Sequence, residues 1–340
     1  MFKDKKILIT GGTGSLGQAL TKKLLKLDVN TIRIFSRNES KQVEMESKFN
    51  DKRLRYFLGD INDLPRLIKA LEDVDFVFHA AALKHVPKIE YNPFEAIKTN
   101  VIGSQNVIEA CVVNKVKKAI CISTDKAVSP LNAYGATKRL MEKLFVSANN
   151  HASTKQHKTQ FITARYGNVF GSSGSVFPKF IEQIKLNQKI TITDPKMTRF
   201  SITMDDALNF IINAIKFGKG SEIFVPRLKA YSILTINDAL SDIYGKIKQE
   251  TIGIRPGEKL HEEMITSSDS YNTVDLGTYY AILPQKSPYS QYSKDDYKEA
   301  FNGKDVPNGF SYNSGNNSDW ESIESLRELV RIHVDSSFKI

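Results

Sequence analysis

Tyr134 and Lys138 stand four positions apart in a segment whose pattern predicts a helix over Tyr134–Asn149. Residues at this spacing share one face of a helix. A nearby ammonium group lowers the pKa of a phenol, so Tyr134 could act as a base near neutral pH. Pairs of this kind also occur by chance, and the surrounding residues decide whether the pair is functional.

A second polar group, Thr124-Asp125-Lys126, lies between the strand predicted at Lys118–Ile122 and the helix that begins at Tyr134. A carboxyl group and an amine act as acid and base in one site only when their environments tune their pKa values apart. The simpler interpretation is a surface ion pair at the end of a strand. It does not explain why the pair stands beside Thr124 and close to Tyr134.

The glycine-rich segment Thr10–Gly17 follows the first predicted strand and opens the first predicted helix. Its glycines allow a tight turn and a close approach of the backbone to phosphate, and the helix N-terminus offers free N–H groups. In this strand–turn–helix context the segment predicts a dinucleotide site rather than a plain glycine turn. The candidate phosphate-binding residues are Gly11, Thr13, Gly14, Ser15, Leu16 and Gly17.

The end of the second predicted strand bears on the choice of dinucleotide. NAD-binding proteins usually carry an acidic residue there, which holds the ribose hydroxyls. This strand ends in Ser36-Arg37, with Lys41 one turn later. A guanidinium group can bind a phosphate through two hydrogen bonds, so these residues favour NADP as the cofactor, and Lys138 could hold its nicotinamide ribose. Alternatively, Arg37 and Lys41 are a solvated surface pair.

Residues 1–170 alternate short apolar runs with longer helical patterns, which is typical of βαβ units with a parallel sheet and right-handed crossovers. We therefore expect an α/β fold, in which a Rossmann-type doubly wound parallel sheet forms an NADP-binding domain over residues 1–170. The expected strands are Lys6–Thr10, Thr31–Phe35, Leu54–Leu58, Asp75–His79, Lys118–Ile122 and Phe161–Arg165. The expected helices are Ser15–Leu27, Leu64–Leu71, Phe94–Val113 and Tyr134–Asn149.

The alternation loosens beyond residue 170. We expect residues 171–340 to form mainly a smaller C-terminal substrate-binding lobe, with some segments free to return to the first domain. Helices are expected at Pro178–Leu186, Asp205–Phe217 and Trp320–Val334, and a strand at Glu222–Val225. The stretch Gln285–Ser318 is rich in Tyr, Ser, Asn, Gly and Lys and predicts a loop.

Composition narrows the class of protein. The 340 residues are 41% hydrophobic and 25% charged, which is usual for a globular chain with a sizeable core. No apolar run reaches the roughly 18 residues of a membrane-spanning helix, and the N-terminus has no apolar signal-peptide core, so we expect a cytoplasmic location without a membrane span. The net charge of +10 is spread along the chain, which favours an anionic substrate over nucleic acid. Cys111, Cys121 and six scattered histidines offer no metal-ligand pattern.

Taken together, these motifs resemble an extended short-chain dehydrogenase/reductase. Several segments are similar to one branch, the nucleotide-sugar 4,6-dehydratases that act on UDP-N-acetylglucosamine. The segments that carry the resemblance are Gly11–Gly17, Ala80–Pro87, Ser123–Lys126, Tyr134–Lys138, Arg165–Val169, Met197–Phe200, Ile254–Leu260 and Tyr312–Trp320. This combination is far more specific than any single motif.

The resemblance implies a sequence of proton and hydride transfers. Tyr134, beside Thr124, takes part in oxidation of the sugar C4 hydroxyl with hydride passing to NADP. Lys126 then removes the C5 proton, Asp125 protonates the leaving C6 hydroxyl, and the hydride returns to C6. Lys126 must be neutral when it acts, which burial and cationic neighbours would favour. Tyr134, where some relatives have Met, makes the chain similar to the C5-inverting enzymes that begin pseudaminic acid synthesis.

The resemblance also assigns the remaining site residues and an assembly. The implied cofactor contacts include Asp60 and Ile61 beside adenine, Ala80, Ala81 and Lys84 along the cofactor and the reacting sugar, and Val169 at the nicotinamide. The implied substrate contacts are Asn168 at the sugar, Arg199 and Arg255 at the diphosphate, and Glu258 at the uridine ribose. The helices at Phe94–Val113 and Tyr134–Asn149 are expected to form the interface of a homodimer or a larger homo-oligomer.

Two other functions stay open on the same scaffold. A nucleotide-sugar 4-epimerase or a plain dehydrogenase needs Tyr134 and Lys138 but has no use for the Asp125-Lys126 pair. A non-catalytic protein that senses NADP would be expected to have lost Tyr134 or Lys138, and both are present. Because one fold supports all of these functions, only the site can separate them.

Overall fold

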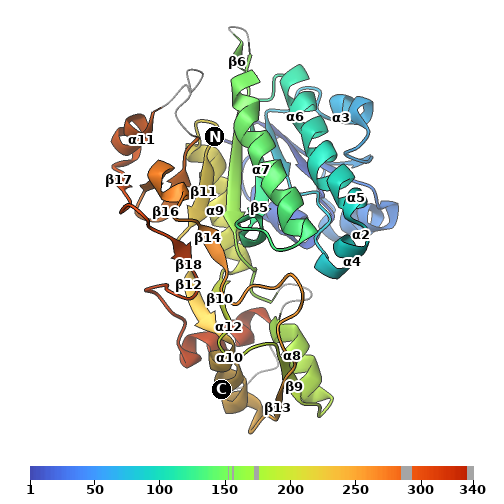
Figure 1. The fold of residues 1–340 in the computed structure, drawn as a ribbon. Coiled ribbons are helices and arrows are strands. Elements are labelled where there is room, and N and C mark those ends of the chain that lie inside the picture. The colour runs from blue at the N-terminus through green and yellow to red at the C-terminus, as the bar shows by residue number, and fades with distance from the viewer. Residues whose placement is uncertain (152, 155–156, 172–175, 285–292, 335–340) are drawn as a thin grey trace.

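A large sheet forms the centre of the protein in the computed structural model, which describes residues 1–151, 153–154, 157–171, 176–284 and 293–334 (Figure 1). Within these residues ten strands pair in the order β17-β15-β16-β11-β8-β5-β4-β1-β2-β3. The strands from β11 to β3 are parallel, and β16, β15 and β17 add an antiparallel edge. Their bounds are β1 Lys6–Thr10, β2 Thr31–Ser36, β3 Leu54–Leu58, β4 Phe76–His79, β5 Lys118–Thr124, β8 Gln160–Tyr166, β11 Ile223–Pro226, β15 Thr273–Asp275, β16 Tyr279–Ile282 and β17 Lys304–Asp305.

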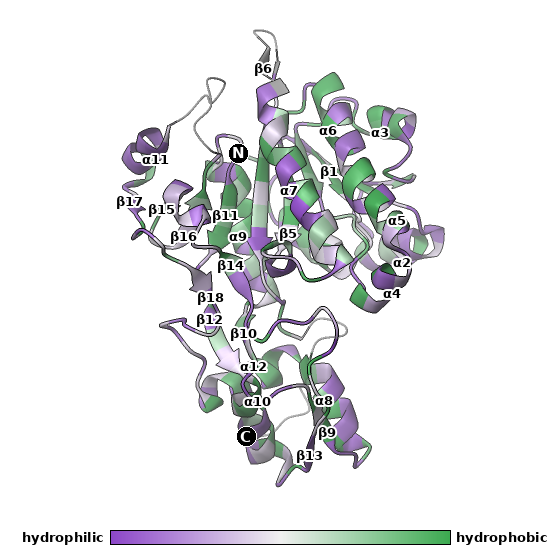
Figure 2. Ribbon diagram, viewed as in Figure 1, coloured by the Kyte–Doolittle hydropathy of each residue, from purple (hydrophilic) through white to green (hydrophobic). Residues whose placement is uncertain are grey.

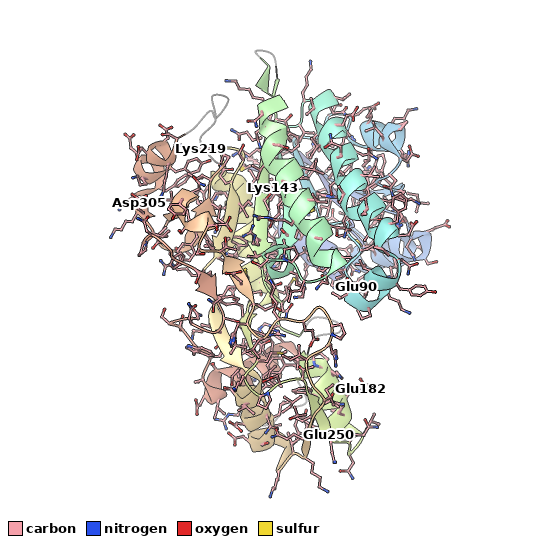
Figure 3. The ribbon with its side chains drawn as sticks, viewed as in Figure 1. Glu90, Lys143, Glu182, Lys219, Glu250 and Asp305 are labelled. Atoms are coloured by element: carbon pink, nitrogen blue, oxygen red, sulfur yellow. The ribbon has the colours of Figure 1, made fainter. Side chains whose placement is uncertain are left out.

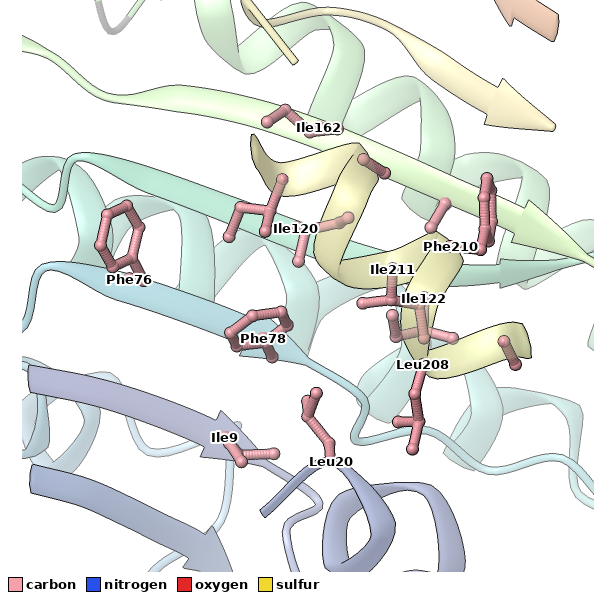
Figure 4. Packing of buried hydrophobic residues seen from close by; sticks show 14 of the residues in the cluster. Ile9, Leu20, Phe76, Phe78, Ile120, Ile122, Ile162, Leu208, Phe210 and Ile211 are labelled. Carbon is pink, nitrogen blue, oxygen red and sulfur yellow. The ribbon is translucent and has the colours of Figure 1, made fainter. Parts of the chain in front are cut away.

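Helices cover both faces of this sheet. On one face α1, α2 and α9 contribute to a hydrophobic cluster with the strands, and on the other face α3, α6 and α7 do so. Leu208 and Ile211 of α9 lie against Ile120 and Ile122 of β5 in Figure 4. The helices are α1 Ser15–Leu24, α2 Glu39–Phe49, α3 Leu64–Ala70, α4 Val86–Tyr91, α5 Pro93–Ala96, α6 Gly103–Val113, α7 Ala133–His151 and α9 Met204–Phe217.

A smaller lobe lies below the carboxyl ends of the parallel strands in Figure 1. Its own hydrophobic cluster joins α8, α10 and α12 to short strands, and exposed charged side chains such as Glu182 and Glu250 project from its outer end (Figure 3). The lobe contains α8 Val176–Lys185, β9 Ile190–Ile192, β10 Thr198–Ser201, β12 Lys229–Ser232, α10 Ile233–Tyr244, β13 Gln249–Thr251 and α12 Ile323–His333. The pair β14 Glu263–Ile265 and β18 Tyr312–Asn313 lies between the lobe and the sheet.

The predicted fold class is confirmed: a mostly parallel, doubly wound sheet carries a smaller C-terminal lobe. Every strand expected before residue 170 is present, with ends that differ by a residue or two. Four strands from the second half of the chain, β11, β15, β16 and β17, also belong to the main sheet. Sequence patterns did not predict α2, α4 and α10.

Two predicted segments differ from the structure. The helix expected at Phe94–Val113 contains a π-helical turn over Ile97–Ile102 between α5 and α6. The stretch Gln285–Ser318, expected as a loop, holds α11 over Lys294–Phe301, because Ser293 and Asp296 form a reciprocal capping box and Tyr297 is buried. Residues 285–292 of that stretch lie outside the described residues.

Candidate active site

The glycine-rich loop joins β1 to α1 at the point where the sheet order reverses, between β1 and β4. Gly11 has a φ of +66°, and a Cβ placed on it would lie 2.8 Å from the Cα of Ala81. A Cβ on Gly17 would lie 2.5 Å from Gly12. Gly14 caps α1 without a side-chain hydrogen bond, so the first N–H groups of α1 can face an anion. The start of α1 is therefore closely packed, has no side-chain cap and lies where the strand order reverses. These three properties fit the binding of a dinucleotide pyrophosphate.

The residues expected to choose between NADP and NAD lie at the end of β2. The Arg37 side chain is 59% exposed, and one of its guanidinium nitrogens is 3.4 Å from a carboxylate oxygen of Asp60. Lys41 is exposed one turn into α2, whereas Ser36 is buried and accepts a hydrogen bond from Gln42. Two exposed cations at this edge could meet a phosphate without moving any buried group. Ile61 is buried in the next turn.

Thr124, Asp125 and Lys126 come together at the carboxyl end of β5. One oxygen of the buried Asp125 carboxylate accepts hydrogen bonds from Thr124 Oγ1 at 2.8 Å and from Lys126 Nζ at 3.1 Å. The other oxygen is buried and has no hydrogen-bond partner among the described residues. Lys126 also lies 3.3 Å from Oδ1 of Asn168, which follows β8. The acid–base pair and a candidate sugar contact therefore share one location.

Tyr134 and Lys138 begin α7 beside this pair, but they differ electrostatically from the expectation. Burial raises the pKa of Tyr134 to about 12, and Lys126 and a hydrogen bond with Thr124 only partly oppose this effect. Burial lowers the pKa of Lys138 to about 8, and its Nζ donates to the Ile122 carbonyl oxygen at 2.6 Å. The expected low pKa of Tyr134 is therefore wrong for this structure, because burial outweighs the nearby cations.

The surroundings of Lys126 favour its charged form in the resting protein, whereas the expectation was a neutral amine at the moment when it acts. Burial by itself would lower the pKa of Lys126, but Asp125 and Glu262 raise it well above its ordinary value. These two carboxylates therefore favour the charged form of Lys126. Among the described residues no group of three or more His, Cys, Asp or Glu side chains could hold a metal ion.

A buried ion pair fixes the strands and the helix around this site. Glu142 of α7 and Arg165 of β8 are both fully buried and form hydrogen bonds of 2.7 and 2.8 Å. Glu142 also accepts from Ser123 of β5 at 2.7 Å, and Arg165 donates to the carbonyl oxygen of Met264 in β14 at 2.6 Å. Four elements around the site are thus tied to one buried pair.

Residues 7–284 match the family described as "Polysaccharide biosynthesis protein". The chain belongs to this family. A relative in Campylobacter jejuni named UDP-N-acetylglucosamine 4,6-dehydratase (inverting) is 49% identical over 333 residues, which cover 97% of this chain and 98% of the relative. A relative in Rickettsia bellii named UDP-glucose 4-epimerase is 45% identical and covers 83% of this chain and 84% of its own length.

Solved structures of related proteins agree with the fold. The X-ray structure of Pen from Bacillus thuringiensis is 40% identical, with a TM-score of 0.86, over 97% of this chain and 98% of Pen. The UDP-glucuronic acid 4-epimerase of Bacillus cereus, solved with UDP-glucuronic acid and NAD, is 26% identical, with a TM-score of 0.66, over 75% and 88% of the two chains. The proteins that this chain is similar to therefore include both dehydratases and epimerases by name.

The remaining predicted site residues occupy four positions. Ala80, Ala81 and the exposed Lys84 follow β4, opposite the glycine-rich loop, and Val169 bridges to Ile202 beside Asn168. Arg255 and Glu258 lie 3.4 Å apart on the lobe, and the Arg255 side chain is 51% exposed. Arg199 is almost buried, and it is 3.5 Å from Glu262. The structure gives no direct contact that joins Arg255 to the Asp125–Lys126 pair.

Two residues of this region were not predicted from the sequence. Asn100, in the π-helical turn, accepts from the backbone N–H of Leu83 at 2.8 Å and donates to its carbonyl oxygen and to Thr137. It thereby fixes the segment after β4 to α7. Glu262, just before β14, is buried 3.7 Å from Lys126. Only the polar asparagine within an apolar helix pattern could have indicated Asn100, and no local pattern distinguishes Glu262 from its charged neighbours.

Proposed function

We propose that the chain is a UDP-N-acetylglucosamine 4,6-dehydratase that inverts C5 and forms UDP-2-acetamido-2,6-dideoxy-β-L-arabino-hex-4-ulose. One observation carries this proposal: a buried carboxylate and an amine lie 3.1 Å apart beside Tyr134, at the carboxyl end of β5. The 49% identical dehydratase of Campylobacter jejuni supports the substrate and the inversion at C5. An epimerase, the name of the Rickettsia relatives, needs Tyr134 but has no step for the Asp125–Lys126 pair.

The Asp125–Lys126 pair can supply both the acid and the base of water loss because it shares one proton. In the ion pair that proton is on Lys126 Nζ. Transfer along the 3.1 Å hydrogen bond to Asp125 yields a carboxylic acid and a neutral amine without any change in net charge. A bound sugar that excludes water favours this neutral form, since desolvation disfavours charged groups. Neutral Lys126 then takes the C5 proton, and Asp125 protonates the departing C6 hydroxyl.

The residues around the glycine-rich loop fit a nicotinamide dinucleotide, and we propose NADP in particular. When bound, NADP would accept the hydride from C4 and return it to C6. Arg37 and Lys41 support the phosphorylated cofactor, whereas the related epimerase of Bacillus cereus was solved with NAD. The positive charge of the oxidised nicotinamide, when bound, would oppose the effect of burial on Tyr134, so that its phenolate can accept the C4 hydroxyl proton. Lys138 holds the nicotinamide ribose. Because both residues are present beside the acid–base pair, a purely NADP-sensing role is less well supported.

We propose that residues 1–170 bind the cofactor and that residues 171–340 mainly bind the UDP part of the substrate, apart from the strands that return to the sheet. Arg255 is the best-supported diphosphate contact, because its side chain is exposed on the lobe near Lys179. Glu258, beside it, has one buried oxygen that finds no partner among the residues the structure describes, and this oxygen could accept a hydrogen bond from the uridine ribose. Arg199 would have to give up its contacts with Glu262 and with the carbonyl oxygens of Thr198 and Leu260 before it could reach the diphosphate.

The proposal extends to the location of the enzyme and to the pathway in which it works. We propose that the enzyme works in the cytoplasm on an early step of pseudaminic acid synthesis, or on another surface glycan that needs a 4-keto-6-deoxy sugar. No helix in the described ranges is long and apolar enough to cross a membrane. Deletion of the gene should abolish the glycan, and normal glycan in the deletion strain would overturn this placement.

The internal return of hydride provides the first test of the proposed reaction. UDP-N-acetylglucosamine that carries deuterium at C4 should give a product labelled in its C6 methyl group, because the hydrogen removed from C4 is returned to C6 of the same molecule. NMR of the product locates the label. A C4 epimer formed without loss of water, or free NADPH accumulating with each turnover, would contradict a dehydratase.

The preference for NADP over NAD can be tested by removing the two positive charges at the end of β2. The double variant Arg37→Ala/Lys41→Ala should bind NADP about 10–100-fold more weakly and NAD nearly unchanged, since it loses charge-assisted hydrogen bonds to the 2′-phosphate. Lys52→Ala, which removes an exposed lysine at the opposite end of the strands, is the matched control. Calorimetric titration measures both affinities, and equal affinity of the parent for NAD and NADP would overturn the preference.

An exposed apolar surface supports the proposed homodimer. Tyr91, Phe94, Ile97, Leu131 and Leu140, on or beside α4, α5 and α7, are 86%, 60%, 37%, 60% and 51% exposed, and Figure 2 shows apolar stretches along these helices. Large exposed apolar surfaces usually mark interfaces. We expect light scattering at micromolar concentration to give at least twice the mass of one chain, and Phe94→Glu to lower it; a monomeric parent would contradict the dimer.

A further inference from the structure

Glu262 occupies a fixed place at the junction between the lobe and the sheet. The residue is 4% exposed and directly precedes β14. Its backbone N–H donates to Ser314 Oγ at 2.9 Å, and its carbonyl oxygen accepts from the Ser314 N–H at 2.8 Å. Ser314 is itself fully buried and lies 2.7 Å from Thr198. The backbone therefore holds the Glu262 side chain in one position.

The carboxylate of Glu262 lies close to two cations, Lys126 from the sheet and Arg199 from the lobe. One of its oxygens lies 3.7 Å from Lys126 Nζ and 3.5 Å from Arg199 Nε. Its other oxygen is buried without a hydrogen-bond partner among the described residues. A buried carboxylate with an unpaired oxygen is costly and needs a compensating role. Packing alone does not supply one, because an apolar side chain of similar size would avoid that cost.

Arg199 acts as a fixed counter-charge to Glu262. Its guanidinium group donates to the carbonyl oxygens of Thr198 at 2.7 Å and Leu260 at 3.2 Å, and it contacts Met197 Sδ at 2.8 Å. These contacts leave the cation pointing at Glu262. Charges thus alternate along a row of Asp125, Lys126, Glu262 and Arg199, in which Lys126 is partly exposed, and their sum is zero.

We propose that Glu262 is a positioning residue for Lys126, and that its charge sets the pH range in which Asp125 and Lys126 share a single proton. This inference rests on the proposed dehydratase function, in which that shared proton serves as acid and base in turn. Glu262 does not need to touch the sugar. It holds the amine of Lys126 between two carboxylates and keeps the proton on the pair at alkaline pH.

The direction of the pH effect follows from the charges that surround Lys126. Asp125, Glu262 and Tyr134 face it, the Lys259 ammonium and the Tyr231 phenol lie close by, and Arg199 faces Glu262. Above the upper apparent pKa of the pair, Asp125 has no proton to give to the C6 hydroxyl. A carboxylate at ion-pair distance raises that pKa, so removal of the Glu262 charge should lower it by about 1–3 units.

The variant Glu262→Gln tests this role, with Glu263→Gln as its matched control. The control removes the same charge one residue later, where the side chain bonds to Ser129 instead of Lys126. We expect Glu262→Gln to move both limbs of the pH profile of kcat for water loss to lower pH, the alkaline limb by about 1–3 units. Glu263→Gln should leave both limbs in place, and Glu262→Asp should restore most of the parent profile.

A measurement on the resting protein separates this inference from the proposed function. Trace labelling with acetic anhydride, followed by mass spectrometry, reports the pKa of each lysine without any substrate. Lys126 should label with a lower pKa in Glu262→Gln than in the parent, because the variant lacks one of the two carboxylates beside the amine. The exposed Lys143 of α7 serves as the internal reference for reactivity. The comparison of parent and variant needs no turnover, so it remains decisive even where Glu262→Gln has lost activity.

The outcomes distinguish two kinds of failure. A parent enzyme that forms no 4-keto-6-deoxy sugar overturns the proposed function, while the labelling experiment still tests the coupling of Glu262 to Lys126. A parent that forms this product, together with a Glu262→Gln variant whose pH limbs stay in place, overturns the role of Glu262. A Lys126 that labels with the same pKa in the parent and in Glu262→Gln overturns it as well.

Discussion

The buried ion pair of Glu142 and Arg165 is the interaction on which the arrangement of the site depends. Glu142 belongs to α7, which also carries Tyr134 and Lys138, and Arg165 belongs to β8. Through Ser123 and Met264 the same pair reaches β5 and β14. Removing one partner of such a pair leaves an uncompensated buried charge, which typically costs about 3–5 kcal/mol. The pair thus fixes the strands and the helix that carry the candidate catalytic groups, whose own contacts then set their side-chain positions.

Charge neutrality explains how so many ionisable groups share one place. The Asp125–Lys126 pair holds one proton, and Glu262 with Arg199 adds an equal number of positive and negative charges. A neutral row tolerates low dielectric surroundings better than an isolated charge does. It also allows the proton to move between Lys126 and Asp125 without a change in net charge. The lobe and the sheet each contribute residues to this row, so the distances between its charges depend on how the lobe is placed against the sheet.

The sequence could predict the parts of the fold and the site that depend on neighbouring residues. Strand–helix alternation, the glycine-rich loop and the Asp125–Lys126 pair are local patterns, and the structure places them as expected. The pKa values of Tyr134 and Lys126 could not be predicted, because both depend on burial, and that of Lys126 depends also on Glu262, far away in the chain. The short strands of the lobe pair across long sequence separations, and no period in the sequence indicates such pairing.

The central claim is that Tyr134 and Lys126 act in order, oxidation first and water loss second, and Lys126→Ala tests it most directly. With UDP-N-acetylglucosamine, this variant should still reduce its bound cofactor, seen as absorbance near ~340 nm from the nicotinamide. Its rate of 4-keto-6-deoxy sugar formation should fall about 10²–10⁴-fold. Tyr134→Phe should lose both signals while it binds NADP as tightly as the parent. Formation of the 4-keto-6-deoxy sugar by Lys126→Ala at the parent rate would contradict the account.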